Sequence, residues 1–533
     1  MSAIIRKYRV LFLILLAAIL GGALLAARSR KAEPAAIVVP EGAKAGDLTA
    51  MKNCPYQAEG SKTVFEAECG TLTVPENWDK AGSRLIALPV VRIPATGPNP
   101  SEPVFWLVGG PGGSNLSWEA PSWLLRNHDV LLVGYRGEDG TVVLTCPEVG
   151  RSLKAHLGVD LWSAQSRSEQ VATVKQCGAR LQASGVDLDG YTMPQVVQDM
   201  EAVRQALGYE RIDLFSESYG TRVAQTYAYM RPQSLRRVIQ IGVNTPGHFL
   251  YDPAVIDKMI GRISELCAQD ASCSSRTGNF AQTMFTVTHN MPRRWLFFNI
   301  DPDTVRLGTQ FMLYSDADIS TIVDVYLAAG QGDASGLFMG NLMAKLLVPA
   351  DSWRYGDIYS KGGSADLDKY RGLESISLGN HILGAPHTEL VFPMAEQWPI
   401  ELIPQELRGF QESNVEMLLI NGTLDFSTPP TALDEAKPYW HKAQMVLLPE
   451  FSHVGDEYTL QQGAFERLIT SYLDTGVGDA SLYVYQPLSF KPAMSMPVLA
   501  KLLVAAIIVV PLLIALIIVV IVRRIRRRRT VQA

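Results

Sequence analysis

The segment 194–242 constrains the fold most, because it alternates between helical and strand-like patterns over a short distance. After Pro194, apolar residues recur at a spacing near 3.6 residues: Val196, Met200, Val203 and Leu207. An apolar run at 212–215, a second helical stretch at 219–230 and another apolar run at 238–242 follow. This alternation predicts parallel strands that are covered by helices.

Further short apolar runs extend the predicted sheet on both sides of this segment. They lie at 84–91, 104–108, 130–133, 415–421 and 445–448, and a closing helix is expected at 464–473. Between 247 and 410 the alternation lapses, and the stretches 254–266 and 319–329 have helical spacing. We therefore predict an α/β core in two parts, 51–246 and 411–480, with a mainly helical cap inserted at 247–410.

Both ends of the chain combine basic and apolar residues. Basic residues precede an apolar run at 10–27, which is typical of a signal peptide or an uncleaved signal anchor. The uncharged run 502–522 is long enough to cross a bilayer, and six arginines within 523–529 place the C-terminus in the cytoplasm by the positive-inside rule. The prediction is a signal segment at 1–27, a linker at 28–50, a transmembrane helix at 502–522 and a basic cytoplasmic tail at 523–533. The catalytic part would then lie outside the cell membrane, with the lipid bilayer as its partner.

The rest of the chain is acidic. Apart from residues 1–36 and 523–533 it carries 36 basic and 52 acidic side chains, a net charge of −16. This argues against the extended basic surface that nucleic-acid binding requires, so no nucleic-acid partner is expected.

Cysteine usage fits an oxidising compartment. The six cysteines fall into three pairs that are close in sequence: Cys54 with Cys69, Cys146 with Cys177, and Cys267 with Cys273. Six cysteines allow fifteen pairings, so sequential disulfides are a prediction from short loops, and six buried thiols are the alternative. The sequence contains no CxxC or Cys/His spacing that would favour a metal site over disulfides. No metal or organic cofactor is expected.

A serine lies at the turn between the predicted strand and helix near residue 218. The stretch Ser216-Glu217-Ser218-Tyr219-Gly220 has small residues two before and two after Ser218. This pattern is typical of a nucleophile elbow, although Ser216 stands where glycine is usual. Because the motif is degenerate, the main evidence for an elbow is that Ser218 lies where a predicted strand ends and a predicted helix begins.

A serine nucleophile needs a base and a third group that orients the base. Asp425 follows the predicted strand at 415–421, and His453 follows the one at 445–448. Ligands of parallel sheets bind at the carboxyl ends of the strands, so both side chains are expected at the same edge. The other histidines do not follow strands in this way: His128, His156, His248, His289, His381, His387 and His441.

Four glycines surround Pro111 in the loop after the strand at 104–108. Glycines allow a substrate carbonyl to approach main-chain N–H groups, so we expect this strand-to-helix loop to form an oxyanion hole. A phosphate-binding loop would need Gly-Lys-Ser/Thr after the glycines, which is missing here.

Together, 109–112, Arg136-Gly137, 216–221, 422–425 with Thr428-Pro429, and Ser452-His453 resemble the α/β-hydrolase branch of proline iminopeptidases and secreted tripeptidyl aminopeptidases. The resemblance implies an α/β-hydrolase fold and a peptidase that acts at free N-termini. It also implies Ser218 as nucleophile, His453 as base, Asp425 as its orienting acid, and the N–H groups of Gly110 and Tyr219 as oxyanion donors. The sequence departs from the family at Val108, where many members have histidine, at Gly134, where an acid is usual, and at Ser216.

These patterns predict a membrane-anchored serine hydrolase, with aminopeptidase activity on peptides as the leading hypothesis. The alternatives are an esterase or amidase that acts on small esters or amides, and a surface binding protein built on an inactive hydrolase. An aminopeptidase needs a carboxylate near the substrate ammonium, because an unpaired buried cation is costly. The cap offers several candidates among which the sequence does not choose: Asp252, Asp257, Glu265, Asp316 and Asp318.

Overall fold

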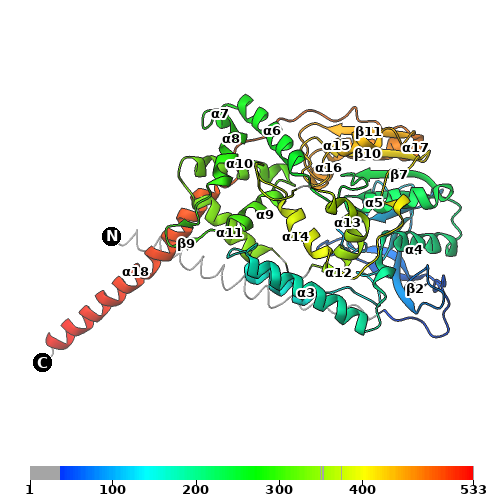
Figure 1. The fold of residues 1–533 in the computed structure, drawn as a ribbon, viewed down its shortest axis with the longest axis horizontal. Coiled ribbons are helices and arrows are strands. Elements are labelled where there is room, and N and C mark those ends of the chain that lie inside the picture. Colours follow the sequence, from blue (N-terminus) through cyan, green and yellow to red (C-terminus); the bar gives the residue numbers. More distant parts are fainter. Residues whose placement is uncertain (1–36, 349, 351–352, 374, 532–533) are drawn as a thin grey trace. The chain divides into compact units, whose positions relative to one another are not determined.

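The computed structural model describes residues 37–531 except 349, 351–352 and 374, and the fold below is that of the unit beginning at Val39. Within those residues, the core is a nine-stranded sheet in the order β1-β2-β3-β5-β4-β6-β7-β10-β11 (Figure 1). The strands from β5 to β11 in this order are parallel, whereas β1, β2 and β3 are antiparallel to their neighbours. The strands are β1 (Lys52–Tyr56), β2 (Phe65–Pro75), β3 (Leu85–Ile93), β4 (Val104–Leu107), β5 (Val130–Val133), β6 (Ile212–Glu217), β7 (Leu235–Ile241), β10 (Glu416–Gly422) and β11 (Ala443–Leu448).

All the predicted strands are present, with ends that differ by up to three residues, and the one predicted at 84–91 is the antiparallel β3. Two differences stand out. The hairpin of β1 and β2 is not among the predicted strands, and no helix follows the glycine-rich loop, because residues 108–129 form turns between β4 and β5. The expectation of a strand-to-helix loop at this point is therefore wrong.

Helices cover both faces of the sheet because successive strand residues point to opposite sides. Leu214 packs in the cluster that includes α4 and α5, whereas Phe215 packs in the cluster that includes α17. The helices of the core are α2 (Pro147–His156), α3 (Ala164–Ala183), α4 (Met193–Ala206), α5 (Tyr219–Met230), α15 (Thr431–Ala436), α16 (Gly455–Thr459) and α17 (Gln462–Thr475).

The segment 247–410 is mostly helical and has two parts. Helices α6 to α11 supply most of a second apolar cluster, which Leu424 and Phe426 from the loop after β10 also join. Tyr355, Tyr359 and Leu390 from the later helices belong to the cluster of the sheet. A short hairpin of β8 (Arg294–Trp295) and β9 (Phe298–Asn299) was not predicted. The helices are α6 (Pro253–Gln269), α7 (Ala271–Ser274), α8 (Phe280–His289), α9 (Pro302–Met312), α10 (Asp316–Gly330), α11 (Ser335–Leu347), α12 (Tyr355–Ile358), the π-helical turn η3 (Tyr359–Gly363), α13 (Ser364–Arg371) and α14 (Pro386–Ala395).

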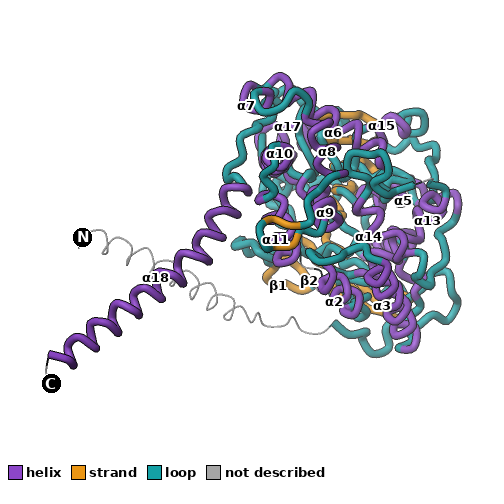
Figure 2. Tube along the Cα trace, turned by 60° about the vertical axis from the view of Figure 1, so that its left-hand side comes forward, coloured by secondary structure: helices purple, strands orange, loops and turns teal. Residues whose placement is uncertain are grey.

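The C-terminal helix α18 (Met496–Val531) is longer than the predicted segment 502–522. Its first turns lie against α10 and α11 (Figure 2). Ala500 is buried in the cluster of α6 to α11, and Leu499 and Leu503 pack against that cluster. Lys501 Nζ pairs with Asp333 Oδ2 at 2.6 Å. The predicted signal segment at 1–27 lies outside the described residues.

Three disulfides are present in the structure. They join Cys54 to Cys69, Cys146 to Cys177, and Cys267 to Cys273, the same pairs that the sequence favours. The first links β1 to β2, the second ties the start of α2 to α3, and the third closes the turn between α6 and α7. Each disulfide therefore joins neighbouring elements rather than the two parts of the core.

Candidate active site

Ser218 lies at a sharp turn between β6 and α5. Its φ of +49° is in the left-handed region, which is strained for a residue with a side chain. The turn is held because Ser218 N–H donates to the carbonyl of Ile241 at 2.8 Å. A Cβ on Gly220 would lie 2.2 Å from the carbonyl oxygen of Leu107, so only glycine fits there. This is the geometry of a nucleophile elbow.

Serine at position 216 fits the same turn. Ser216 is fully buried, and its hydroxyl donates to the carbonyl of Ile239 on β7 at 2.7 Å. Because this hydrogen bond satisfies the hydroxyl, the replacement of the usual glycine adds a contact within the sheet and leaves Ser218 in place.

The structure brings together three of the predicted residues at the carboxyl edge of the sheet. His453 Nε2 is 3.0 Å from Ser218 Oγ, and His453 Nδ1 is 2.8 Å from Asp425 Oδ2. The loops after β10 and β11 cross closely, since a Cβ on Gly422 would lie 2.0 Å from the carbonyl oxygen of Phe451. With Nδ1 protonated toward the carboxylate, Nε2 is free to accept the serine proton.

Asp425 is fully buried and well supplied with hydrogen-bond donors. Its Oδ1 accepts the N–H groups of Ser427 and Thr428, each at 2.8 Å. Its Oδ2 accepts the hydroxyl of Thr428 at 2.6 Å in addition to His453. These bonds hold the carboxylate in one orientation. Thr428 belongs to one of the motifs that carry the family resemblance, but no spacing pattern in the sequence indicates that its hydroxyl binds Asp425.

The glycine-rich loop passes close to Ser218. A Cβ on Gly109 would lie 3.0 Å from the Cβ of Ser218, so the loop can approach the nucleophile only without a side chain there. Gly110 and Tyr219 line the same cavity as Ser218, and neither N–H is a donor in the hydrogen bonds between described residues. Two unused amide donors beside a serine can stabilise a negatively charged oxygen.

Glu217 directly precedes Ser218 at the end of β6, and its side chain is half-buried. Burial is the main cause that raises its pKa above the ordinary value, and the backbone of Gly109 opposes that rise. Glu217 occupies the variable position of the elbow motif, so sequence reasoning had no signal that would single it out.

A cavity of about 290 Å³ opens in front of Ser218. Much of its wall comes from aromatic residues of the cap: Phe249, Tyr251, Phe311, Tyr314, Trp353, Tyr355, Tyr359 and Phe392. His387 also lines it, although its sequence position gave no such indication, and burial lowers its pKa to about 4, so that it is neutral at pH 7. Arg354 lines the cavity and pairs with Glu138 at 3.1 Å.

No carboxylate is among the described residues that line this cavity. The five acidic residues that the sequence offered for ammonium binding lie elsewhere. Asp252 caps α6, Asp257 pairs with His381 at 2.7 Å, and Glu265 pairs with Arg262 at 3.0 Å. Asp316 and Asp318 lie in the first turn of α10. None of the five is therefore a wall residue of the cavity.

Comparisons with known proteins agree with this geometry. The family model described as alpha/beta hydrolase fold matches residues 102–260. A tripeptidyl aminopeptidase of Streptomyces lividans is 28% identical over 233 residues, which cover 41% of this chain and 42% of that protein. The serine protease Hip1 of Mycobacterium tuberculosis is 26% identical over 326 residues, which cover 56% of this chain and 59% of that protein.

The matched region spans about half the length of these relatives. Among solved structures, a serine hydrolase from Cycloclasticus zankles is 12% identical with a TM-score of 0.36, over 77% of this chain and 100% of that one. The strand order, the elbow at Ser218 and the family match together show that the chain has an α/β-hydrolase fold and is similar to serine peptidases of that fold.

Proposed function

We propose that this protein is a serine hydrolase that works through an acyl-enzyme. The observation that carries the proposal is the chain of hydrogen bonds from Ser218 through His453 to Asp425. Ser218 Oγ would attack the substrate carbonyl while His453 Nε2 takes its proton, and the imidazolium would then protonate the leaving group. Water, activated by the same histidine, would release the acyl group and restore Ser218.

The oxyanion formed in each step would accept hydrogen bonds from the N–H groups of Gly110 and Tyr219. Both line the cavity beside Ser218, and Tyr219 N–H is at the first residue of α5, where the helix dipole also favours negative charge. Asp425 would hold the imidazole in the required tautomer and stabilise its positive charge.

The leading substrate class is short peptides with apolar side chains, cleaved near a free N-terminus. The aromatic wall of the cavity supports the apolar preference, since it offers contact area and few polar partners. The resemblance to a tripeptidyl aminopeptidase supports exopeptidase activity. An esterase is the second candidate, and the cavity wall favours it because no described wall residue is a carboxylate that could pair with an ammonium.

A reporter series separates the two activities. The full-length protein in detergent would be offered aminoacyl, dipeptidyl and tripeptidyl reporters, the same reporters with an acetylated amine, and short-chain esters. An aminopeptidase should lose at least about a hundredfold in kcat/KM on acetylation, which corresponds to about 2.7 kcal/mol. Equal turnover of free and acetylated peptides would remove the aminopeptidase assignment and favour the esterase.

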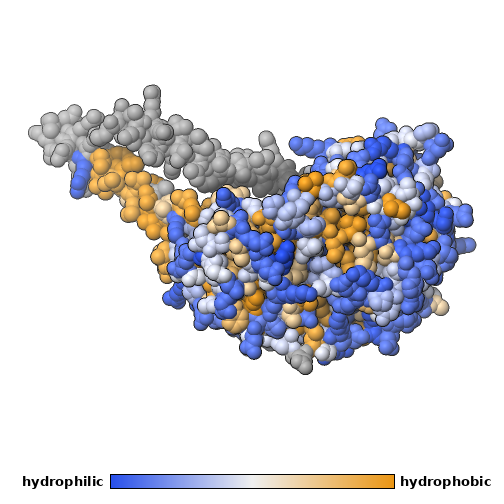
Figure 3. Space-filling view, turned by 90° about the horizontal axis from the view of Figure 1, so that it is seen from above, coloured by the Kyte–Doolittle hydropathy of each residue, from blue (hydrophilic) through white to orange (hydrophobic). Residues whose placement is uncertain are grey.

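We also propose that α18 anchors the protein in the bilayer, with the catalytic part on the outer side. α18 is long and apolar enough to cross a membrane, and its surface is apolar along most of its described length (Figure 3). Residues 505–522 would span about 27 Å as a helix, close to the thickness of the hydrocarbon core. The disulfides and the arginines from 523 onward fit this orientation.

A topology experiment tests the anchor. Protease added outside intact cells should degrade or release the catalytic part, while a tag placed after Ala533 should stay protected. Digestion of the tag with the cells intact would contradict the proposed orientation.

A further inference from the structure

A buried ion pair in the cap lies beside the glycine-rich loop. Asp357 is in α12 and Lys361 is in the adjoining turn η3, four residues later, with Lys361 Nζ 2.6 Å from Asp357 Oδ1. Both side chains are completely buried. Burying two charges costs several kcal/mol before their attraction is counted, so such a pair is weak evidence for stability alone. Both side chains also contact the core.

Asp357 contacts the loop that carries a proposed oxyanion donor. Its second oxygen, Oδ2, accepts the N–H of Gly112 at 3.0 Å. Gly112 is two residues after Gly110 in the same tight loop, where a Cβ on Gly110 would lie 3.0 Å from the nitrogen atoms of both Gly112 and Gly113. A shift of Gly112 would therefore displace Gly110 as well.

Lys361 contacts the segment after β5 and lies near the ring of Tyr219, whose N–H is the second proposed oxyanion donor. Its Nζ donates to the carbonyl of Arg136 at 3.2 Å. It also lies 4.9 Å from the ring centroid of Tyr135 and 5.8 Å from that of Tyr219. The guanidinium of Arg136 donates two hydrogen bonds to Asp199 on α4, at 2.6 and 2.5 Å. Lys361 therefore binds a residue whose side chain is anchored in the core.

Gly137 makes room for this arrangement. Its φ is +85°, and a Cβ there would lie 2.6 Å from Asp357 Oδ1. Any other residue would collide with the carboxylate of the cap. The Arg136-Gly137 motif, to which the proposed reaction assigns no step, thus supplies both a carbonyl for Lys361 and space for Asp357.

We infer that Asp357 and Lys361 are positioning residues that seat the cap on the core and thereby fix the oxyanion loop. The inference rests on the proposed hydrolase function. It makes the cap part of the catalytic apparatus, because one of its carboxylates orients the loop on which Gly110 lies. It predicts that breaking the pair lowers kcat more than it changes KM, since an oxyanion hole acts mainly in the transition state.

The test replaces the pair by apolar residues of similar size, Asp357→Leu with Lys361→Met, which avoids leaving one buried charge unpaired. We expect kcat to fall about 10- to 100-fold with KM changed less than about threefold. The pH at which activity is half-maximal should stay the same, because His453 and Asp425 are untouched. Backbone hydrogen exchange of the peptide 109–114 should become at least about tenfold faster.

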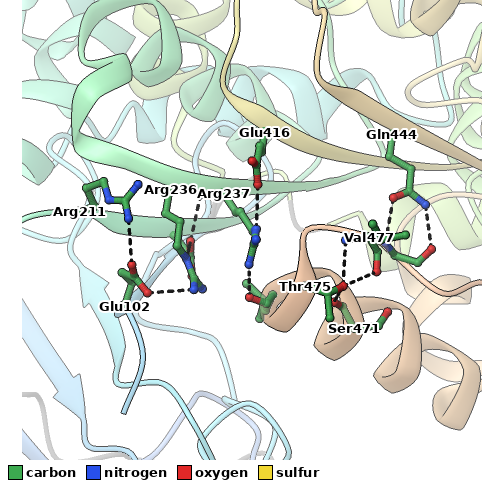
Figure 4. A network of polar contacts seen from close by, with 12 residues as sticks. Glu102, Arg211, Arg236, Arg237, Glu416, Gln444, Ser471, Thr475 and Val477 are labelled. Carbon is green, nitrogen blue, oxygen red and sulfur yellow. Dashed lines mark hydrogen bonds and ion pairs between the residues drawn. The ribbon is translucent and has the colours of Figure 1, made fainter. Parts of the chain in front are cut away.

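A matched control removes another largely buried ion pair, Asp213→Leu with Arg236→Met. This pair lies at the amino-terminal ends of β6 and β7, opposite the active edge, where Arg236 also binds Glu102 (Figure 4). At a temperature where it is folded, this variant should keep the wild-type kcat and the wild-type exchange of 109–114. Denaturant unfolding of both variants identifies any loss of fold.

A second variant, Asp357→Asn with Lys361→Met, removes both charges and keeps an acceptor for Gly112, so it serves if the first double variant does not fold. It should lose about three- to tenfold in kcat. Wild-type kcat in the folded Asp357→Leu, Lys361→Met variant or, if that does not fold, in the Asp357→Asn, Lys361→Met variant would overturn the inference. Unchanged exchange of 109–114 would overturn it as well. If the wild-type protein turns over no ester or peptide, the proposed function fails, while the exchange measurement still decides whether the pair holds the loop.

Discussion

Replacing Thr428 by valine should loosen Asp425 without changing the charge of the site. The hydroxyl of Thr428 donates to Asp425 Oδ2 at 2.6 Å, and the same oxygen accepts His453 Nδ1 at 2.8 Å. Valine has no hydroxyl to donate, so of these two hydrogen bonds Asp425 Oδ2 keeps only the one from His453. A hydrogen bond to a buried charged group contributes about 1.5 to 3 kcal/mol, so we expect the free energy of unfolding to fall by about that amount.

The same substitution should lower kcat by roughly tenfold, because the carboxylate that orients His453 loses one of its supports. Thr428→Ser is the matched control, since it keeps the hydroxyl and removes only a methyl group worth about 0.8 kcal/mol. The assays are urea unfolding and steady-state turnover of the best reporter at a temperature where all variants are folded. If valine preserves both stability and kcat, or if serine loses as much as valine, the hydroxyl does not support the acid and the account of this site is wrong.

Two further predictions concern the cap. Ending the chain after Ala493 removes Ala500, Leu499 and Leu503 from the cluster of α6 to α11, so this fragment should be about 2 to 4 kcal/mol less stable to urea than one that ends after Val504. Equal stability would show that the start of α18 does not stabilise the cap. Burial lowers the pKa of His387 from 6.5 to about 4, so between these values the unfolded chain binds a proton that the folded chain does not. Stability should therefore fall by about 2 kcal/mol from pH 7 to pH 5, and His387→Phe should abolish that part of the fall.

Much of the sheet could be predicted because its central strands are short continuous apolar runs. Strands such as β5 and β6 are buried on both faces, so local hydrophobicity alone marks them. The hairpin of β1 and β2 lacks that signal, since β1 is largely exposed and contains Pro55. The two strands pair locally, with Tyr56 opposite Phe65 and Lys52 opposite Cys69, so it is the exposed, polar character of β1 and not a long-range contact that hides the hairpin from the sequence pattern.

The same contrast applies to the site. Ser218, Asp425 and His453 each follow a recognisable strand, so the edge at which they meet could be predicted from strand order. His387 reaches the cavity only because α14 packs against α9, and Asp357 with Lys361 resembles an exposed i,i+4 pair on a helix. Their burial depends on Gly112 and Gly137 from a distant part of the chain, so no local pattern indicates it.

Covalent labelling by a fluorophosphonate tests the central claim most directly, because the reagent reacts with a serine that a neighbouring base activates. The full-length protein should gain one phosphonyl group on the peptide that contains Ser218, and Ser218→Ala should abolish the label. Ser216→Ala should keep it, since the Ser216 hydroxyl is buried against Ile239. Labelling that persists in Ser218→Ala, or that is lost only in Ser216→Ala, would contradict the assignment of Ser218 as the nucleophile.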